Sequence, residues 1–318
     1  MIFSLFGLHL EAHGPHAIRF FPCQTALMNL AVLSRGPQLY STRSLVQAGR
    51  RRGHRVEVID HLYCNLLIEG GQPQVFHGDR LLWGVDAVIP RIGASVTVPG
   101  AAIIRQFEMM GIFSVTSSEA LLRSRDKLQC LQWLSQVGVG LPRTAYSNFT
   151  ETPRELIDLA GGVPLVIKLL KSTHGLGVIL AEKESVAESV IEAFARIRER
   201  VIVQEYIAEA GGADLRVLVI DGQVVAAMKR QAQPGEFRSN LHRGATATPV
   251  ELEPEEAATA IRAAEALGLK VAGVDLLQSD RGPLVLEVNP SPGLEGITST
   301  TGIDIADHII RYIEKEVI

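Results

Sequence analysis

Short apolar runs alternate with longer amphipathic runs from residue 28 to about residue 116. The apolar runs at 30–33, 56–59, 86–89 and 112–115 predict strands, and the amphipathic runs at 41–52 and 100–110 predict helices between them. Strands separated by helices are typical of βαβ units, in which the sheet is largely parallel and covered on both faces. The pattern therefore predicts an α/β domain over this part of the chain.

Beyond this region the pattern becomes a mixture of helices and antiparallel hairpins. Helices are predicted at 117–137, 153–159, 185–198, 255–267 and 303–317, and strands at 143–146, 165–170, 178–181 and 201–207. The runs 214–220 and 223–230 flank Asp221-Gly222, a pair typical of a tight hairpin turn. We therefore expect an α+β region after the parallel sheet.

The segment 271–289 predicts a second hairpin, with a three-residue loop over 280–282 and Gly282 in the left-handed conformation. Folding about Arg281 places Asp275 opposite Glu287. Because side chains alternate along a strand, Asn289 then shares their face. The opposite face is apolar and is expected in the core, with Ala272, Val274, Leu276, Leu284, Leu286 and Val288.

Two facing carboxylates repel each other unless a cation lies between them. Carboxylate and amide oxygens are the ligands that a hard divalent cation such as Mg²⁺ prefers. Asp275, Glu287 and Asn289 are therefore candidate metal ligands. The alternative is a solvated acidic edge of the hairpin.

Lys168 interrupts the apolar strand 165–170, and lysine is seldom buried without a partner. The loop that follows contains Gly175 and Gly177, whose backbone N–H groups could cover phosphates together with Lys168. The loop lacks the GK[ST] ending of a Walker A motif and the third glycine of a dinucleotide fingerprint. The alternative is that Lys168 guards an exposed sheet edge against aggregation.

Further cations lie in predicted loops. Arg35 and Arg91 follow strands whose carboxyl ends usually face ligands, so they are candidates for binding a carboxylate or a phosphate, or else project into solvent. The loop 235–244, GEFRSNLHRG, fits phosphate or acyl-phosphate stabilisation better than DNA contact, because no wider basic field surrounds it.

Composition narrows the choice of function. The 318 residues are 47% hydrophobic and carry a net charge of −4, which argues against nucleic-acid binding through a basic surface. Three well-separated cysteines favour a reducing, cytoplasmic compartment, and no apolar run is long enough to span a membrane. Residues 1–27 do not fit a signal peptide and are expected to be a poorly ordered extension.

The order of Lys127, Lys168, the 172–177 loop, the QEYI segment at 204–207, FRSNLHRG and the Asp275…Glu287-Val288-Asn289 set resembles ATP-grasp ligases. More narrowly, VIPRIG, RQFEM, RDKL, GPLVLEVN and TTGIDIA are similar to the RimK family, over essentially all of residues 28–314. Two positions depart from the family pattern: Ala245 replaces the last glycine of HRGG, and Pro290 stands where Ser or Ala is common.

This resemblance implies a Rossmann-like pre-ATP-grasp domain at 28–118, followed by an ATP-grasp domain at 119–318. The latter consists of two α+β lobes, at about 128–206 and 207–318, that enclose ATP. The ATP-binding residues that it implies are Lys127, Lys168, Gly175, Gly177, Gln204, Glu205, Tyr206, Ile207, Asp214, Arg238, Ser239 and Asn240. Asp275, Glu287 and Asn289 would hold Mg²⁺ or Mn²⁺, with two ions expected. Arg216, Arg230 and Arg238 are the candidates for stabilising the acyl-phosphate.

RimK enzymes glutamylate the C-terminus of small-subunit ribosomal protein S-six, so glutamate, a protein or peptide C-terminus and a homo-oligomeric enzyme are expected. Two alternatives remain open: a ligase that joins an amino acid to a small molecule, and a non-catalytic nucleotide-binding regulator of a ribosomal partner. The second alternative is disfavoured because both lysines and all three metal-ligand candidates are present.

Overall fold

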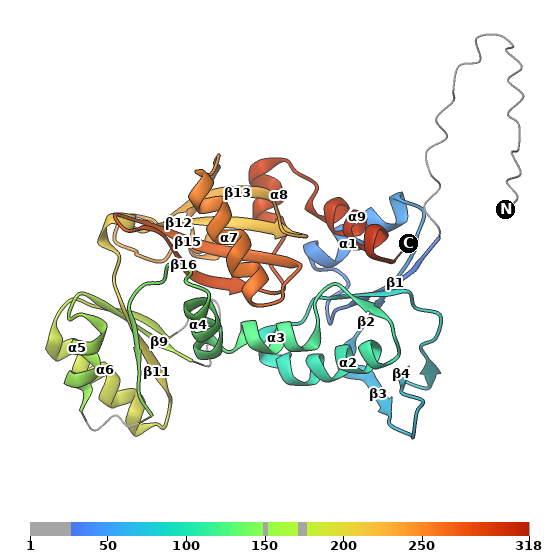
Figure 1. The fold of residues 1–318 in the computed structure, drawn as a ribbon, viewed down its shortest axis with the longest axis horizontal. Coiled ribbons are helices and arrows are strands. Elements are labelled where there is room, and N and C mark those ends of the chain that lie inside the picture. Colours follow the sequence, from blue (N-terminus) through green and yellow to red (C-terminus); the bar gives the residue numbers. More distant parts are fainter. Residues whose placement is uncertain (1–26, 149–151, 171–176, 318) are drawn as a thin grey trace, which may run out of the picture.

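A computed structural model of the chain describes residues 27–148, 152–170 and 177–317 (Figure 1). The expected N-terminal extension therefore lies, apart from Leu27, outside the described residues. None of the helices in these ranges is long and apolar enough to cross a bilayer.

The first part of the chain forms the predicted parallel sheet, with strand order β2-β1-β6-β7. Its strands are β1 (Asn29–Leu33), β2 (Arg55–Ile59), β6 (Ala87–Pro90) and β7 (Phe113–Ser114), and its helices are α1 (Tyr40–Arg51) and α2 (Thr97–Met109). All four residues of β6 are buried, as expected for a strand covered on both faces. A small antiparallel sheet, which the sequence pattern does not predict, is formed by β3 (Cys64–Leu67), β4 (Gln74–His77) and β5 (Arg80–Leu81).

The single helix predicted at 117–137 is wrong in one respect, because it is broken at Asp126. The structure has α3 (Ser118–Arg125) and α4 (Lys127–Gln136), and the backbone at Asp126 is extended, with ψ of 107°. The Asp126 side chain accepts a hydrogen bond from Gln129 N at 2.9 Å, so it caps the N-terminus of α4. The break places Lys127 in the first turn of a new helix.

The middle of the chain forms a four-stranded antiparallel lobe, with strand order β10-β9-β11-β8. The strands are β8 (Thr144–Tyr146), β9 (Leu165–Leu169), β10 (Val178–Ala181) and β11 (Val201–Glu205), and α5 (Pro153–Ala160) and α6 (Glu184–Arg196) pack against them. β9, which carries Lys168, pairs on both sides, with β10 and β11. Lys168 is therefore not on a sheet edge, and the edge-guard interpretation is wrong.

A five-stranded antiparallel sheet with order β14-β13-β12-β15-β16 forms the last lobe (Figure 1). Its strands are β12 (Ala213–Ile220), β13 (Gln223–Gln231), β14 (Thr246–Pro249), β15 (Val271–Ser279) and β16 (Gly282–Asn289). Helix α7 (Pro254–Ala266) covers one face, and the chain ends with α8 (Glu295–Thr301) and α9 (Ile305–Val317).

The β15–β16 hairpin confirms the predicted pairing of Asp275 with Glu287, although its turn length and its register differ from the prediction. The turn contains two residues between the strands rather than three, and the register shifts by one residue beside Leu276, so that Leu276 pairs with Val285. Leu286 therefore has no partner on β15 and forms a β-bulge. As a result Val285 is fully buried in the core and Leu286 is only partly buried, which corrects the predicted core set.

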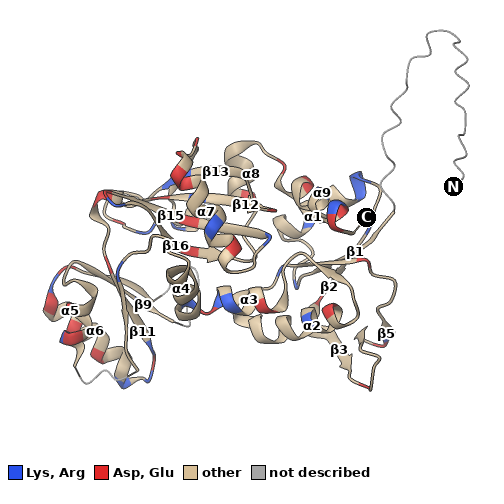
Figure 2. Cartoon of the chain, in the orientation of Figure 1, with Lys and Arg blue, Asp and Glu red and all other residues tan. Residues whose placement is uncertain are grey.

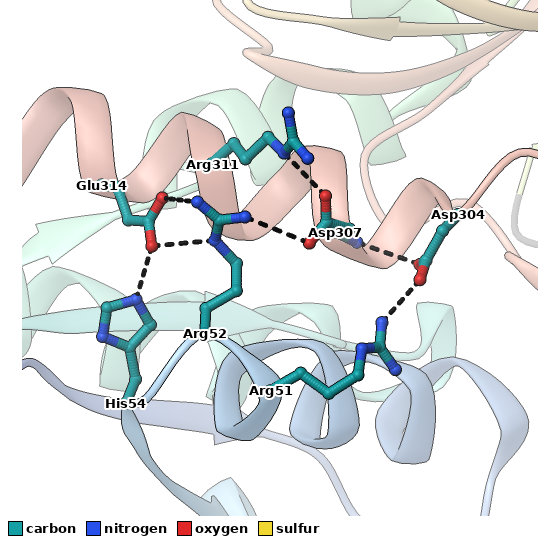
Figure 3. Close-up of polar contacts among 7 residues, drawn as sticks. All are labelled: Arg51, Arg52, His54, Asp304, Asp307, Arg311 and Glu314. Carbon is teal, nitrogen blue, oxygen red and sulfur yellow. Dashed lines mark hydrogen bonds and ion pairs between the residues drawn. The ribbon is translucent and has the colours of Figure 1, made fainter. Parts of the chain in front are cut away.

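Helix α9 packs beside α1 of the first domain, although the two helices are more than 250 residues apart (Figure 1). Buried apolar residues of β1, α1, α8 and α9 share one core with β12 and β13. At the ends of α1 and β2, Arg52 and His54 bind Glu314 of α9, with Arg52 Nη2 at 2.6 Å and His54 Nε2 at 2.8 Å (Figure 3). The chain terminus thereby ties the last lobe to the first domain.

Candidate active site

One face of the five-stranded sheet changes from apolar to charged along its length. The apolar half, with Leu218 and Met228, packs toward α8 and α9. Residues further along the same strands form a chain of ion pairs that includes Arg216 of β12 and Asp275 of β15, which are opposite each other in the sheet. This charged half of the face is the centre of the candidate site.

Arg216 donates to both carboxylate oxygens of Asp275, through Nε and through Nη2, the latter at 2.7 Å. Arg230 donates to both oxygens of Asp214, with Nε at 2.7 Å, and its Nη2 also lies 3.1 Å from Asp275 Oδ2. Burial alone would raise the pKa of Asp275, but Arg216 and Arg230 outweigh it and hold that pKa below its usual range. Asp275 is therefore an anion held in a fixed orientation.

The three predicted metal ligands lie at the adjoining end of the hairpin. Asp275 pairs with Glu287, and Gly273 pairs with Asn289 two residues along on the same face. Unlike Asp275, Glu287 is exposed and forms no hydrogen bond or ion pair within the described ranges.

The chemistry of this donor set fits a hard divalent cation. A carboxylate has about four lone-pair positions, so Asp275 retains acceptor capacity after binding two guanidinium groups. Both carboxylate oxygens of Glu287 are available as ligands, and Asn289 adds an amide oxygen. Among the described residues, no group of three His, Cys, Asp or Glu side chains is placed to hold a metal ion. The set at the hairpin is of another kind, with two carboxylates and an amide oxygen as the third ligand.

Two lysines lie within electrostatic reach of Glu287. Lys168 Nζ donates to Gln204 Oε1, and Lys127 Nζ donates to Leu169 O at 2.7 Å. Burial lowers the pKa of Lys168 to about 8, with a smaller contribution from Lys127, whereas the Glu287 charge opposes the shift in both lysines. Lys168 of β9 and Lys127 at the start of α4 thus place two cations near the Glu287 carboxylate of the last lobe.

Gln204 connects Lys168 to the neighbouring strand, because its Nε2 donates to Thr144 Oγ1 at 2.8 Å. The strand that was predicted over 201–207 ends at Glu205, so Tyr206 and Ile207 begin the connection between the two lobes. Tyr206 lies edge-on to Phe237, with ring centroids 6.5 Å apart. These positions suit the predicted adenine contacts, which stay a prediction.

Glu205 is held on two sides, since its Oε1 accepts from Arg143 N at 2.6 Å and forms an ion pair with Arg281 in the hairpin turn. This contact ties the middle lobe to the tip of β15–β16. The carboxylate is therefore occupied, and the backbone of the 204–207 segment is the part left to frame a purine.

The polar loop after β13 lies next to the ion-pair chain. Ser239 is buried and hydrogen-bonds to Asp214, so Asp214 faces both Arg230 and this loop. Arg238 donates from Nε and Nη2 to Glu236, at 2.9 and 2.7 Å, and its Nη1 is 3.5 Å from Val178 O of the middle lobe. Asn240 precedes the short helix at Leu241–Arg243.

Of the two predicted phosphate-loop glycines, Gly175 lies outside the described residues. Gly177 has φ of +64°, and its carbonyl accepts from Leu169 N at 2.9 Å. A Cβ atom at this position would lie 2.3 Å from Leu169 Cδ1. The position therefore requires glycine on two independent grounds.

Two further cations lie near this site, and sequence patterns indicate them only weakly. Arg125 ends α3, in the basic segment next to α4 (Figure 2), and donates to Ile92 O at 2.8 Å. Arg91 donates to Pro292 O at 2.7 Å, directly after the β15–β16 hairpin that carries the candidate metal ligands (the metal hairpin). Arg91 is one of the predicted anion-binding candidates, whereas Arg125 is not. The proximity of Arg91 to Arg125, and of Arg125 to Glu287, depends on tertiary packing.

The whole chain is similar in sequence to known proteins. A family model described as the RimK-like ATP-grasp domain matches residues 124–313, and one described as the RimK PreATP-grasp domain matches residues 28–121. The chain is 57% identical over 288 residues to a "Probable alpha-L-glutamate ligase" of Syntrophotalea carbinolica, covering 91% of this chain and 96% of that protein. A protein of the same name from Azotobacter vinelandii is 59% identical with the same coverage.

Solved structures show the same fold at lower identity. The ATP-grasp ligase PsnB, complexed with a phosphomimetic variant of its minimal precursor, Mg and ADP, has a TM-score of 0.69 at 21% identity over 92% of this chain and 99% of that one. A RimK domain ATP-grasp protein from Sphaerobacter thermophilus has a TM-score of 0.67 at 23% identity, over 90% of this chain and 99% of that one.

Proposed function

Since the chain belongs to the RimK family of ATP-grasp ligases, we propose that it adds glutamate to the C-terminus of a protein, and that this acceptor is small-subunit ribosomal protein S-six. The observation that carries the proposal is the facing pair Asp275 and Glu287 within electrostatic reach of Lys127 and Lys168. Such an arrangement of oxygen ligands and cations suits a metal–nucleotide substrate.

In the proposed reaction, an oxygen of the acceptor carboxylate attacks the γ-phosphorus of ATP, and ADP leaves. The glutamate nitrogen then attacks the carbonyl carbon of the acyl-phosphate, phosphate leaves, and the nitrogen loses a proton. An amide bond forms and ATP becomes ADP and phosphate. No side chain has to serve as a covalent nucleophile.

The side chains of the site bind and orient the reactants. We assign the phosphates to Lys168 and Lys127, with Gly175 and Gly177 in the loop over them, and the adenine to residues 204–207. Asp214, Arg238, Ser239 and Asn240 are assigned to the remainder of the nucleotide. A divalent ion held by Asp275, Glu287 and Asn289 would neutralise phosphate charge when bound.

Arg216 and Arg230 act in the proposal partly through Asp275. Their bonds to its carboxylate set its orientation toward Glu287. They also supply positive charge at the sheet face, where the acyl-phosphate and the subsequent oxyanion would need it. Arg238 is the third candidate for this role.

A second candidate function is the ligation of an amino acid to a small molecule. It is favoured by Ala245 and Pro290, which depart from the family pattern and lie beside the polar loop and the metal hairpin. Both candidates use the same nucleotide chemistry and differ in the acceptor.

A single assay separates the two. Purified protein with ATP, Mg²⁺ and glutamate is tested for ADP release with and without ribosomal protein S-six or a peptide of its C-terminus, and the products are weighed by mass spectrometry. Glutamate-sized increments on the protein support the proposal. ADP release that needs only a small carboxylic acid, with no change in the mass of the protein, would replace it with the second candidate.

A further inference from the structure

Two partly buried arginines lie where the first domain meets the metal hairpin. Arg91 directly follows β6, and its Nη2 donates to Pro292 O at 2.7 Å. Arg125 ends α3, and its Nη2 donates to Ile92 O at 2.8 Å, one residue from Arg91. Both guanidinium groups therefore bind the short loops that meet at this junction.

The loop after β16 fixes the junction next to the metal-ligand candidates. Leu294 N donates to Ser41 Oγ at 3.0 Å, which pins this loop to the first domain. Pro292 packs so closely on Gly273 that a Cβ there would lie 2.8 Å from Pro292 Cβ. Since Gly273 pairs with Asn289, Arg91 contacts a residue that covers the metal end of the hairpin.

The charges of these arginines are not neutralised locally. In the described ranges, neither Arg91 nor Arg125 forms an ion pair with a carboxylate, and the buried Nε of Arg125 has no hydrogen-bond partner. Burial, with a smaller contribution from the charge of Arg125, lowers the pKa of Arg91 to about 10. Withdrawing a charged group from water without a paired charge is unfavourable, so a bound anion would offset a cost at these two partly buried arginines.

We propose that Arg91 and Arg125 bind a carboxylate of the incoming amino-acid substrate, one that does not react. A guanidinium group matches the planar geometry of a carboxylate and can bind both of its oxygens. The assignment rests on the proposed function, since it names the residues that would recognise glutamate at the same site.

A carboxylate suits this subsite better than an ATP phosphate. Lys127 and Lys168 come from α4 and from the middle lobe, whereas Arg91 belongs to the first domain and binds the loop that follows the metal hairpin. The arginine subsite thus adjoins the metal hairpin from the first-domain side. A dicarboxylic amino acid bound there would have its charge recognised before its amine reacts.

The test measures steady-state kinetics of Arg91→Met and Arg125→Met with the full chain and the acceptor used above. Loss of a charge-assisted contact of this kind typically costs about 10–100-fold. We therefore expect the KM for glutamate to rise by about this factor, while the KM for ATP stays within a few-fold. Arg125→Lys should recover part of the loss, and Arg105→Met, at an exposed position of α2, is the matched control.

Substrate analogues separate recognition from a structural role. The wild type should discriminate against either glutamine or glutamate α-amide, whichever lacks the carboxylate that is bound, and Arg125→Met should lose that discrimination. An unchanged glutamate KM in an active, folded Arg125→Met would overturn the subsite, as would a rise in the KM for ATP alone or an equal loss with every analogue. Absence of glutamate-dependent ADP release by the wild type would overturn the proposed function itself and the subsite with it.

Discussion

The chain uses arginine–carboxylate networks in two regions, for different purposes. Between α1 and α9, Glu314 accepts from Arg52 Nε and His54 Nε2 on one oxygen and from Arg52 Nη2 on the other (Figure 3). On the sheet face, Arg216 and Arg230 hold Asp275 in a similar way. Both networks are largely withdrawn from water, and both join elements that are distant in the sequence.

The difference between the two regions lies in what surrounds each network. Beside Asp275 stand Glu287, which has no partner in the described ranges, and lysines whose pKa values are lowered by burial. In the α1–α9 cluster the neighbouring carboxylate is itself paired, since Asp307 binds both Arg52 and Arg311. A buried ion pair therefore does not by itself mark a functional site. What distinguishes the sheet face is a neighbouring carboxylate, Glu287, that has no partner in the described ranges.

The largest effect is expected from Glu287→Gln. Glu287 is exposed and forms no ion pair in the described ranges, so the fold should be unaffected, whereas one proposed metal-ligand carboxylate is lost. ADP release should fall by on the order of 10²–10³, the typical loss for one preorganised electrostatic contact. The measurement is kcat at saturating ATP and Mg²⁺, with the melting temperature as the control for folding. Wild-type turnover would remove Glu287 from the metal site.

Glu314→Gln should lower the stability of the protein and leave its turnover nearly unchanged. The change removes the charge that pairs with Arg52, and a loss of about 2–3 kcal/mol in the free energy of unfolding is expected, below the full cost of breaking a buried pair because Arg52 remains partly in water. Turnover per folded molecule should stay within a few-fold of wild type. Urea denaturation and ADP release test the two halves separately, and a kcat that collapses in a stably folded variant would contradict a purely structural role.

The same pair predicts a pH dependence of stability. Burial would raise the pKa of Glu314, but the bonds from Arg52 and His54 outweigh it and leave the pKa below its usual range. A depressed pKa contributes stability above the unfolded-state pKa of about 4.3 that is lost as the pH falls through the folded-state value. The melting temperature of the wild type should thus fall in acid more steeply than that of Glu314→Gln. Parallel curves would refute this contribution.

A smaller effect is expected on the affinity for ATP, which should decrease at alkaline pH as Lys168 loses its charge. Burial lowers the pKa of Lys168 to about 8, and the proposed phosphate contact needs the charged form, so ATP affinity should weaken by about tenfold per pH unit above that value. Isothermal titration with ATP and Mg²⁺ between pH 7 and 9.5 measures the slope. Lys168→Gln has no group to titrate and should bind weakly and without this slope. A flat wild-type profile would show that Lys168 does not act as a titrating phosphate contact.

The sequence predicted the active-site hairpin well because its information is local. Strand alternation alone places Asp275 opposite Glu287, and this pairing is confirmed. It does not determine where an extra residue is accommodated, since Val285 and Leu286 are equally apolar, and so the core assignment of Leu286 was wrong.

Contacts between distant segments could not be predicted in the same way. The amphipathic pattern predicts α9 as a helix, but nothing in it identifies α1 as the partner. The break at Asp126 is likewise decided by packing, because aspartate is tolerated inside helices about as well as many other residues. Arg91 and Pro292 are 201 residues apart, and their contact exists only once both lobes are in place.

The smallest effect is expected next to the strong pair, at Arg51. Arg51 pairs with Asp304 (Figure 3). Both of these side chains are more than half exposed, whereas the adjacent Arg52 is about three-quarters covered. Exposed pairs contribute about 0.2–1 kcal/mol, so Arg51→Met should lower the free energy of unfolding by less than about 1 kcal/mol, and Arg52→Met by severalfold more. Denaturation in low and high salt adds a second criterion, because only the exposed pair should be screened. Equal losses from the two substitutions would show that burial does not set the strength of this docking network.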